Sequence, residues 1–192
     1  MKDIFEQIYS SNSWKDNYGT ASGPGSAIEC SKEYLLFLQN YVKQNNIVSI
    51  LDLGCGDFNL MRHFNFDNVQ YLGLDIVSTA IEYNRINYSK QNIKFQEMDI
   101  FSFKSSDKFD LVILKEVLQH FSNDSIIKLL TNIDYAKNLI IINDITDDNI
   151  DCIDGGYRPI NLNKYPFNFN YEKIFEYDSC GFIKNVNLTT FQ

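Results

Sequence analysis

Three aspartates and two glycines stand where they could hold a nucleotide-like ligand. Asp52 lies near the end of an apolar run, and Gly54 and Gly56 follow it directly. Glycines in such a turn let backbone N–H groups come close to a ligand. Asp75 ends a second apolar run about 20 residues further on, where a carboxylate can accept hydrogen bonds from both hydroxyls of a ribose. Asp99 follows a third run, where it can accept from an adenine amine.

The spacing of the glycines narrows the choice of nucleotide. A dinucleotide site has a third glycine, in the pattern Gly-x-Gly-x-x-Gly, and Asn59 occupies that place here. Without this glycine the turn does not fit the NAD or FAD pattern. The sequence therefore favours another adenosine-containing ligand.

The elements that must position these residues alternate along the chain. Apolar runs predict strands over 47–53, 69–75, 93–98, 109–114 and 138–143. Helical patterns lie at 27–44, with Ser26 and Glu29 as a capping box, at 78–89, with Ser78 as N-cap, and from Asn123 or Asp124 onward. A short helix is expected after the glycine turn. This alternation predicts an α/β fold with a parallel sheet and right-handed crossovers.

The length predicts one domain over residues 1–192 with four parts. An N-terminal lid and helix segment covers 1–44, with a glycine-rich loop from residue 18 to 26, and the cofactor-binding core covers 45–143. The segment 144–170 is rich in Asp, Asn, Gly and Pro, and because loops of this length are usually functional or disordered, we expect a functional loop. Residues 171–192 favour a closing antiparallel hairpin, with a helix at 171–178 as the competing interpretation.

Composition limits the partners. The chain has 25 acidic and 17 basic residues, a net charge of −8, and no basic cluster, so we expect no nucleic-acid partner. With four scattered cysteines and two histidines, it offers no metal motif, and free thiols in a reducing compartment are expected. No apolar run is long enough for a membrane span, and the N-terminus is unlike a signal peptide. We expect a cytoplasmic protein with a small-molecule substrate and no membrane partner.

In combination, these motifs resemble the class I S-adenosylmethionine-dependent methyltransferases. The resemblance covers about residues 45–145 and rests on four stretches: Asp52-Leu-Gly-Cys-Gly56, Asp75-Ile76, Met98-Asp-Ile100, and Phe109-Asp-Leu-Val-Ile-Leu114 followed by Val117-Leu-Gln-His120. It implies a Rossmann-like three-layer sandwich with a seven-stranded, mostly parallel sheet in the order 3-2-1-4-5-7-6. The C-terminal hairpin suits the last two strands. Phe58 departs from the family pattern, which often has a third glycine there.

The resemblance also assigns roles to residues. It implies that Asp52, Gly54, Cys55 and Gly56 border the methionine part of S-adenosylmethionine, whose product is S-adenosylhomocysteine. The remaining cofactor residues are Asp75 for the ribose, Ile76 beside the adenine, Asp99 and Ile100 for the adenine amine and ring, and Lys115 through its backbone.

The flanking segments are similar to small methyltransferases associated with bacterial surface-polysaccharide (capsule) modification. The stretches concerned are Trp14, Ser22-Gly-Pro-Gly-Ser26 and Asp154-Gly-Gly-Tyr-Arg-Pro159. This similarity implies an acceptor pocket formed by the N-terminal segment and the loop after strand five. Its candidate substrate-binding residues are Tyr9, Trp14, Tyr157 and Arg158. Packing against the first long helix is the other interpretation of Tyr9 and Trp14.

A neutral acceptor would need a base, and His120 is the catalytic candidate because its ordinary pKa lies near neutral pH. A role in packing is the alternative, and His63 is expected to be structural. Glu116 and Asp144 also follow strands and are weaker candidates for the base. Arg158 could clamp a phosphate or carboxylate of an anionic acceptor, or form a surface salt bridge.

Three functions stay open at this stage. The leading one is O-methylation of a small molecule: a sugar, a nucleotide-linked precursor or a phosphorylated precursor of a surface polysaccharide. The second is methylation of a macromolecule, which the acidic charge and the absence of an Asp/Asn-Pro-Pro-Tyr motif disfavour. The third is a non-catalytic cofactor-binding or scaffold subunit, against which the three intact carboxylates argue.

Overall fold

Seven strands form a single sheet in the order β3-β2-β1-β4-β5-β7-β6. Strands β1 to β5 run parallel, β7 pairs antiparallel with β5, and β6 with β7. The bounds are β1 Ser49–Leu53, β2 Gln70–Asp75, β3 Ile93–Glu97, β4 Phe109–Lys115, β5 Ala136–Asp144, β6 Glu172–Ser179 and β7 Phe182–Thr190. The predicted fold class is confirmed, and the tail forms a hairpin rather than a helix. This computed structural model describes residues 1–15 and 20–191, so residues 18 and 19 of the predicted loop lie outside the described residues.

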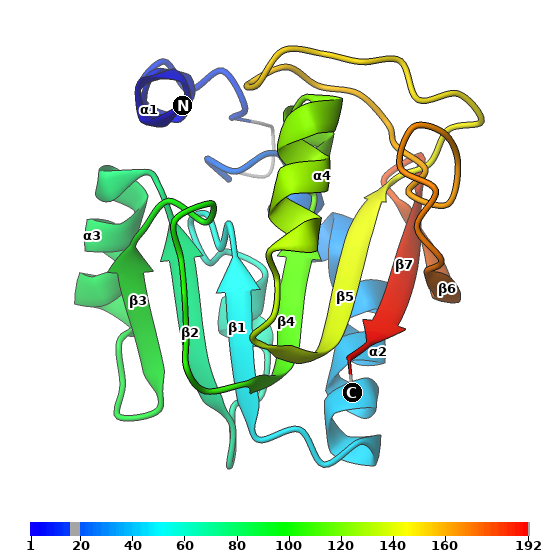
Figure 1. Cartoon of the computed structure of the whole chain (residues 1–192). Helices are drawn as coiled ribbons and strands as arrows, with labels where there is room; N and C mark the ends of the chain where they lie inside the picture. Colours follow the sequence, from blue (N-terminus) through cyan, green and yellow to red (C-terminus); the bar gives the residue numbers. More distant parts are fainter. Residues whose placement is uncertain (16–19, 192) are drawn as a thin grey trace.

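Helices cover both faces of the sheet. The α-helices are α1 Lys2–Ser10, α2 Ile28–Gln44, α3 Ser78–Tyr88 and α4 Asn123–Thr131, and the short 3-10 helices are η1 Pro24–Ser26, η2 Met61–His63 and η3 Leu118–His120. Helix α4 lies in front of the sheet and α2 behind it (Figure 1). Helix α1 and the long loop after β5 lie beyond the carboxyl ends of the parallel strands. The site therefore has to be sought at that end.

Each face of the sheet has its own core because successive side chains of a strand point to opposite sides. Leu51 and Leu53 of β1 pack in one cluster with Ile126 of α4. Ile50 packs in the other cluster with Leu38 of α2. Full burial of a side chain of this size contributes about 1.5–3 kcal/mol, so β1, buried on both faces, is held firmly under the glycine turn.

Two predicted helix caps are wrong. Ser26 belongs to η1, and α2 begins after Ala27, with no side-chain cap. Ser78 is the first residue of α3 rather than its cap, and its hydroxyl donates a hydrogen bond to Glu6 Oε1 at 2.8 Å. A tertiary contact uses the Ser78 hydroxyl, which the local pattern cannot show, whereas the Ser26 hydroxyl donates to the nearby carbonyl of Ser22 at 3.4 Å.

The prediction that all four cysteines are free thiols is wrong for two of them. Cys30 at the start of α2 and Cys180 in the turn between β6 and β7 form a disulfide across 150 residues of sequence. Cys55 and Cys152 are free. The disulfide ties the segment that follows the glycine-rich loop to the tip of the hairpin.

Candidate active site

The glycine turn after β1 wraps around the end of β2. The N–H groups of Gly54 and Cys55 both donate to the carbonyl of Leu74, at 2.8 and 2.9 Å. Gly54 has a φ of +82°, and a Cβ there would lie 2.5 Å from Val117 Cγ2. The turn therefore requires glycine both for its backbone conformation and for its close approach to the residues after β4.

Asp75 at the end of β2 is anchored by backbone N–H groups. Gly56 donates to its Oδ2 and Val77 to its Oδ1, each at 2.9 Å. Burial raises the pKa of this carboxyl, and the backbone hydrogen bonds offset part of that shift. Each oxygen keeps a lone pair beyond the one that the backbone uses. Asp75 can therefore accept two further hydrogen bonds.

Asp52 lies beneath the glycine turn and accepts a hydrogen bond from the Tyr71 hydroxyl at 2.7 Å. Burial raises its pKa to about 6, although the Tyr71 hydrogen bond and the Lys115 ammonium oppose the shift. The carboxyl thus titrates close to neutral pH. A cation placed beside it would favour the ionised form.

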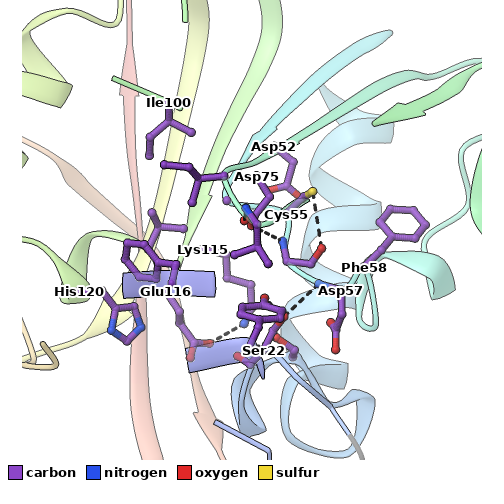
Figure 2. A pocket seen from close by; sticks show the side chains of 18 of the residues that line it. Ser22, Asp52, Cys55, Asp57, Phe58, Asp75, Ile100, Lys115, Glu116 and His120 are labelled. Carbon is purple, nitrogen blue, oxygen red and sulfur yellow. Dashed lines mark hydrogen bonds and ion pairs between the residues drawn. The ribbon is translucent and has the colours of Figure 1, made fainter. Parts of the chain in front are cut away.

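A cavity lies at this end of the sheet, and all nine residues predicted to hold the cofactor line it (Figure 2). They are Asp52, Gly54, Cys55, Gly56, Asp75, Ile76, Asp99, Ile100 and Lys115. We call this the first cavity. Asp99 uses one carboxylate oxygen to accept from the N–H of Phe101, at 3.0 Å.

The N-terminal segment forms part of the wall of the first cavity. The hydroxyls of Tyr9 and Ser22 lie 2.5 Å apart, and Ser22 Oγ accepts from the N–H of Asp57 at 3.0 Å. Asp57 in turn accepts from the N–H of Ala21 at 2.8 Å. Tyr9 and Trp14, predicted to bind substrate, both line this cavity. The sequence reasoning did not single out the side chains of Ser22 and Asp57; only the glycines flanking Ser22 marked its loop as shaped.

His120 ends η3 and is fixed on two sides. Its Nδ1 donates to the carbonyl of Gly156 at 2.8 Å, because a carbonyl can only accept. The Trp14 ring lies 4.5 Å away, at an interplanar angle of 31°. Burial lowers the pKa of His120, and the Gly156 carbonyl offsets part of this shift. The imidazole is therefore neutral at pH 7, with Nε2 as the nitrogen that can accept a proton.

A second cavity lies beside the first. The residues lining both are Trp14, Ser22, Glu116 and His120, which we call the shared wall. The second cavity is further lined by Gly23, Pro24 and Gly25, by Gln119 and Asp144, by Tyr157 of the long loop, and by Ser179, Phe182 and Lys184 of the hairpin.

Glu116 of this wall belongs to a network of four charged side chains, all of which line one or both cavities. Glu116 contacts Lys115 Nζ at 2.5 Å and Lys184 Nζ at 3.2 Å. Lys184 Nζ also lies 2.6 Å from Asp144 Oδ1, and Asp144 Oδ2 accepts from the Tyr157 hydroxyl at 2.5 Å. Burial alone would raise the pKa of Glu116, but the two ammonium groups outweigh it and hold the pKa at about 2. Glu116 is consequently a weak base, which argues against its use as the general base.

Arg158 does not line either cavity. Its guanidinium is buried and donates from Nη1 to the carbonyl of Ile150 at 2.8 Å and from Nη2 to that of Phe121 at 3.0 Å. The Phe167 ring lies 5.8 Å from its Cζ. These contacts fold the long loop on itself, so Arg158 is not placed as an anion clamp. Its Nη2 also lies 3.8 Å from Oδ1 of Asp151, an exposed residue, so the salt-bridge interpretation holds although the guanidinium itself is buried.

The described residues offer no group of three or more His, Cys, Asp or Glu side chains that could hold a metal ion. Within residues 1–15 and 20–191, no helix is long and apolar enough to cross a membrane.

Comparison with known proteins agrees with this geometry. Residues 44–157, more than half of the chain, match the family described as "Methyltransferase domain", and the chain belongs to that family. Among curated proteins, malonyl-[acyl-carrier protein] O-methyltransferase of Acetivibrio thermocellus is 31% identical over 78 residues. This match covers 40% of the present chain and only 28% of that enzyme.

Solved structures share the fold at low sequence identity. Magnesium protoporphyrin IX methyltransferase (ChlM) from Synechocystis PCC 6803 with bound SAM superposes with a TM-score of 0.70 at 14% identity, covering 100% of this chain and 95% of that one. The DhpI–SAH complex gives 0.66 at 13% identity, covering 97% and 96%. The mitomycin 7-O-methyltransferase MmcR gives 0.63 at 14% identity, covering 83% and 55%.

Proposed function

We propose that the protein is an S-adenosylmethionine-dependent O-methyltransferase that acts on a small molecule. The observation that carries this proposal is the shared wall, where His120 lines both cavities and keeps Nε2 available to accept a proton, because Nδ1 donates to the Gly156 carbonyl. Family membership and the small-molecule methyltransferases among the structural neighbours support it.

The residues of the first cavity fit S-adenosylmethionine. The glycine turn brings the backbone of residues 54–56 to the cavity wall. The Asp75 carboxylate has two lone pairs for ribose hydroxyls, and Ile76 and Ile100 offer apolar surface to an adenine. Asp52 would favour the cationic amino group of the methionine part. When bound, the cofactor supplies an electrophilic methyl group carried on a sulfonium.

The chain's own residues then orient the acceptor and take its proton. His120 Nε2 accepts the proton of the acceptor hydroxyl, which leaves the oxygen free to form its new bond to carbon. The resulting imidazolium is stabilised by the Gly156 carbonyl and by the nearby carboxylates of Glu116 and Asp144. General base assistance of this kind contributes about 10²–10⁴-fold in rate, and orientation of the reactants about 7–11 kcal/mol in favourable cases.

For the acceptor we propose a sugar, a nucleotide-linked precursor or a phosphorylated precursor of a bacterial surface polysaccharide, methylated in the cytoplasm. It would occupy the second cavity, between the N-terminal lid segment 1–44 and the acceptor loop 144–170, with the hairpin 171–192 closing one side. Trp14 and Tyr157 line this cavity, which supports their proposed part in binding the acceptor, and Tyr9 meets it through Ser22.

The test begins with calorimetric titration of the protein with S-adenosylhomocysteine and, separately, with NAD. We expect micromolar binding of the former and none of the latter. Panels of sugars and sugar phosphates are then incubated with methyl-labelled S-adenosylmethionine, on wild type and His120→Gln. Labelled product that falls by about 10²-fold or more in the variant supports the base. Failure of a folded wild type to bind S-adenosylhomocysteine overturns the proposal, and binding without turnover on any panel favours a non-catalytic subunit.

A further inference from the structure

Glu116 occupies an unusual position at the point where the two cavities meet. It directly follows β4, and its φ of +57° lies in the left-handed region that residues other than glycine rarely adopt. Such backbone strain persists only where surrounding contacts hold it, and it clusters at functional sites. Figure 2 shows the Glu116 side chain lying between His120 and Lys115.

The glycine-rich loop rests on this side chain. A Cβ on Gly25 would lie 2.1 Å from Glu116 Oε2 and 2.2 Å from Oε1. The backbone at Gly25 is not left-handed, so lack of space alone excludes a larger residue there. The carbonyl of Gly25 accepts from Lys115 Nζ and from the Ser31 hydroxyl, each at 2.7 Å. Loop, lysine and carboxylate therefore form one packed unit.

The carboxylate cannot move aside freely. It is fastened to Lys115 on one side and to Lys184 on the other, and the Lys184 side chain is only 5% exposed. Displacing it would leave a buried ammonium without one of its carboxylate partners, which is strongly unfavourable. The network thus connects β4, next to the first cavity, with β7, next to the second.

We propose that Glu116 is a positioning residue: its carboxylate, bridged between Lys115 and Lys184, seats the loop at Gly25 and so fixes the wall that the two cavities share. The inference rests on the proposed function, because that wall is where acceptor and methyl donor would meet. Through the same carboxylate, Glu116 also acts on the base. The charged groups around His120 are Glu116, Asp144 and Lys184; the carboxylates favour its protonated form, and the ammonium opposes it.

The first test is a double-mutant cycle between Gly25→Ala and Glu116→Ser, with S-adenosylhomocysteine as the probe. In the wild-type background the added methyl group must displace the carboxylate, and we expect affinity to fall by about tenfold. In the Glu116→Ser background the space is vacant, so the same change should cost less than about twofold. Equal losses in both backgrounds would show that Gly25 and Glu116 act independently, which overturns the inference.

The second test follows the imidazole of His120 by NMR in wild type and Glu116→Gln, with His63, on the 3-10 helix η2, as the internal reference. Loss of the negative charge should lower the pKa of His120, whereas the resonances of His63 should not differ between the two proteins. A purely structural role for Glu116 would not move the His120 titration selectively, and an unchanged curve overturns the inference. This readout needs no ligand. If the wild type binds no S-adenosylhomocysteine but the titration shifts, the proposed function fails while the link from Glu116 to His120 stands.

Discussion

The residues predicted to hold the cofactor in the first cavity all lie in the glycine turn or within three positions of a strand end, whereas the second cavity is lined by residues from distant segments. Gly54 donates to the backbone carbonyl of Leu74, and Asp75 accepts from the backbone N–H groups of Gly56 and Val77. Around the second cavity, Glu116 and Lys184 are held by ion pairs. The disulfide from Cys30 to Cys180 adds a covalent tie near its rim.

This difference indicates that the two cavities respond to different substitutions. A site built from the ends of a parallel sheet shares the stability of the sheet core, since its strands are buried on both faces. A site formed between a loop, a long connection and a hairpin depends on a few specific ion pairs and on a disulfide. We therefore expect that, away from the shared wall, the two cavities can be perturbed one at a time. The following experiments test or refine that expectation.

The largest effect should come from the disulfide. Replacing Cys30 and Cys180 together by serine should lower the free energy of unfolding by about 2–5 kcal/mol, because the bond closes a long loop in the unfolded chain. Denaturant titration measures this, with Cys152→Ser as the control for a free cysteine. Affinity for S-adenosylhomocysteine should remain within about twofold of wild type, provided that the sites are separable. A parallel loss of affinity in a folded variant would contradict the separation.

The next effect should come from Asp75→Asn. The amide cannot accept from both Gly56 and Val77, and it presents one acceptor fewer to a ribose. We expect a loss of about 3 kcal/mol in binding S-adenosylhomocysteine, or roughly 100-fold, by calorimetry. Asp110→Asn is the matched control, because Asp110 also accepts backbone N–H groups, those of Val48 and Ser49, but does so at the opposite end of β1. Equal loss in the control would assign the effect to folding.

A smaller difference in stability should separate the two reasons why the turn requires glycine, namely its left-handed backbone and the close contact with Val117. Gly54 and Gly181 have φ values of +82° and +92°, but only Gly54 has a neighbour, Val117 Cγ2, within 4 Å of the added Cβ. Gly181→Ala should cost about 1 kcal/mol of stability through backbone strain, and Gly54→Ala about 1–3 kcal/mol more through the clash. Urea unfolding of both variants measures the difference. Similar losses of stability in the two variants would mean that the Val117 side chain moves aside at little cost.

The smallest effect concerns pH. Since the pKa of Asp52 is about 6, its carboxyl becomes protonated as the pH falls from 7 to 5, and it then attracts a cationic amino group less. Affinity for S-adenosylhomocysteine should fall by about tenfold over that range, and Asp52→Asn should flatten the profile. Folding responds in the opposite sense. Because burial raises the pKa, the contribution of this group to stability is present below about pH 4 and is lost as the pH rises through 6.

The sheet and the residues of the first cavity could be predicted from the sequence because the patterns that indicate them are local. Each cofactor residue lies at or just after an apolar run, and the carboxyl ends of parallel strands meet at one edge. Asp75 and Asp99 could be located in this way without knowledge of any distant contact. The same reasoning placed His120 after the fourth strand, although not the Gly156 carbonyl that fixes its tautomer.

The second cavity could not be predicted from the sequence to the same degree, because its ion pairs and the disulfide join residues far apart in the chain. Nothing near Lys184 indicates that it meets Glu116, 68 positions earlier. Arg158 stood out in the sequence as a lone cation beside glycines, yet it is buried, and its Nη1 and Nη2 donate to the carbonyls of Ile150 and Phe121. Cys30 and Cys180 gave no spacing signal. Tertiary pairings of this kind leave no periodicity in the chain.

The disulfide has a further consequence for a chain cut by a protease. The long loop after β5 lies between Cys30 and Cys180 in sequence and exposes side chains such as Ile153, at 83%, and Tyr165, at 81%. A single cleavage there would leave two fragments joined as one covalent species, which would separate on a gel only after reduction. Limited proteolysis would therefore cut the loop that contributes Tyr157 to the second cavity, while the disulfide keeps the parallel sheet and the hairpin together. Ligand binding to the first cavity can then be measured in this nicked protein.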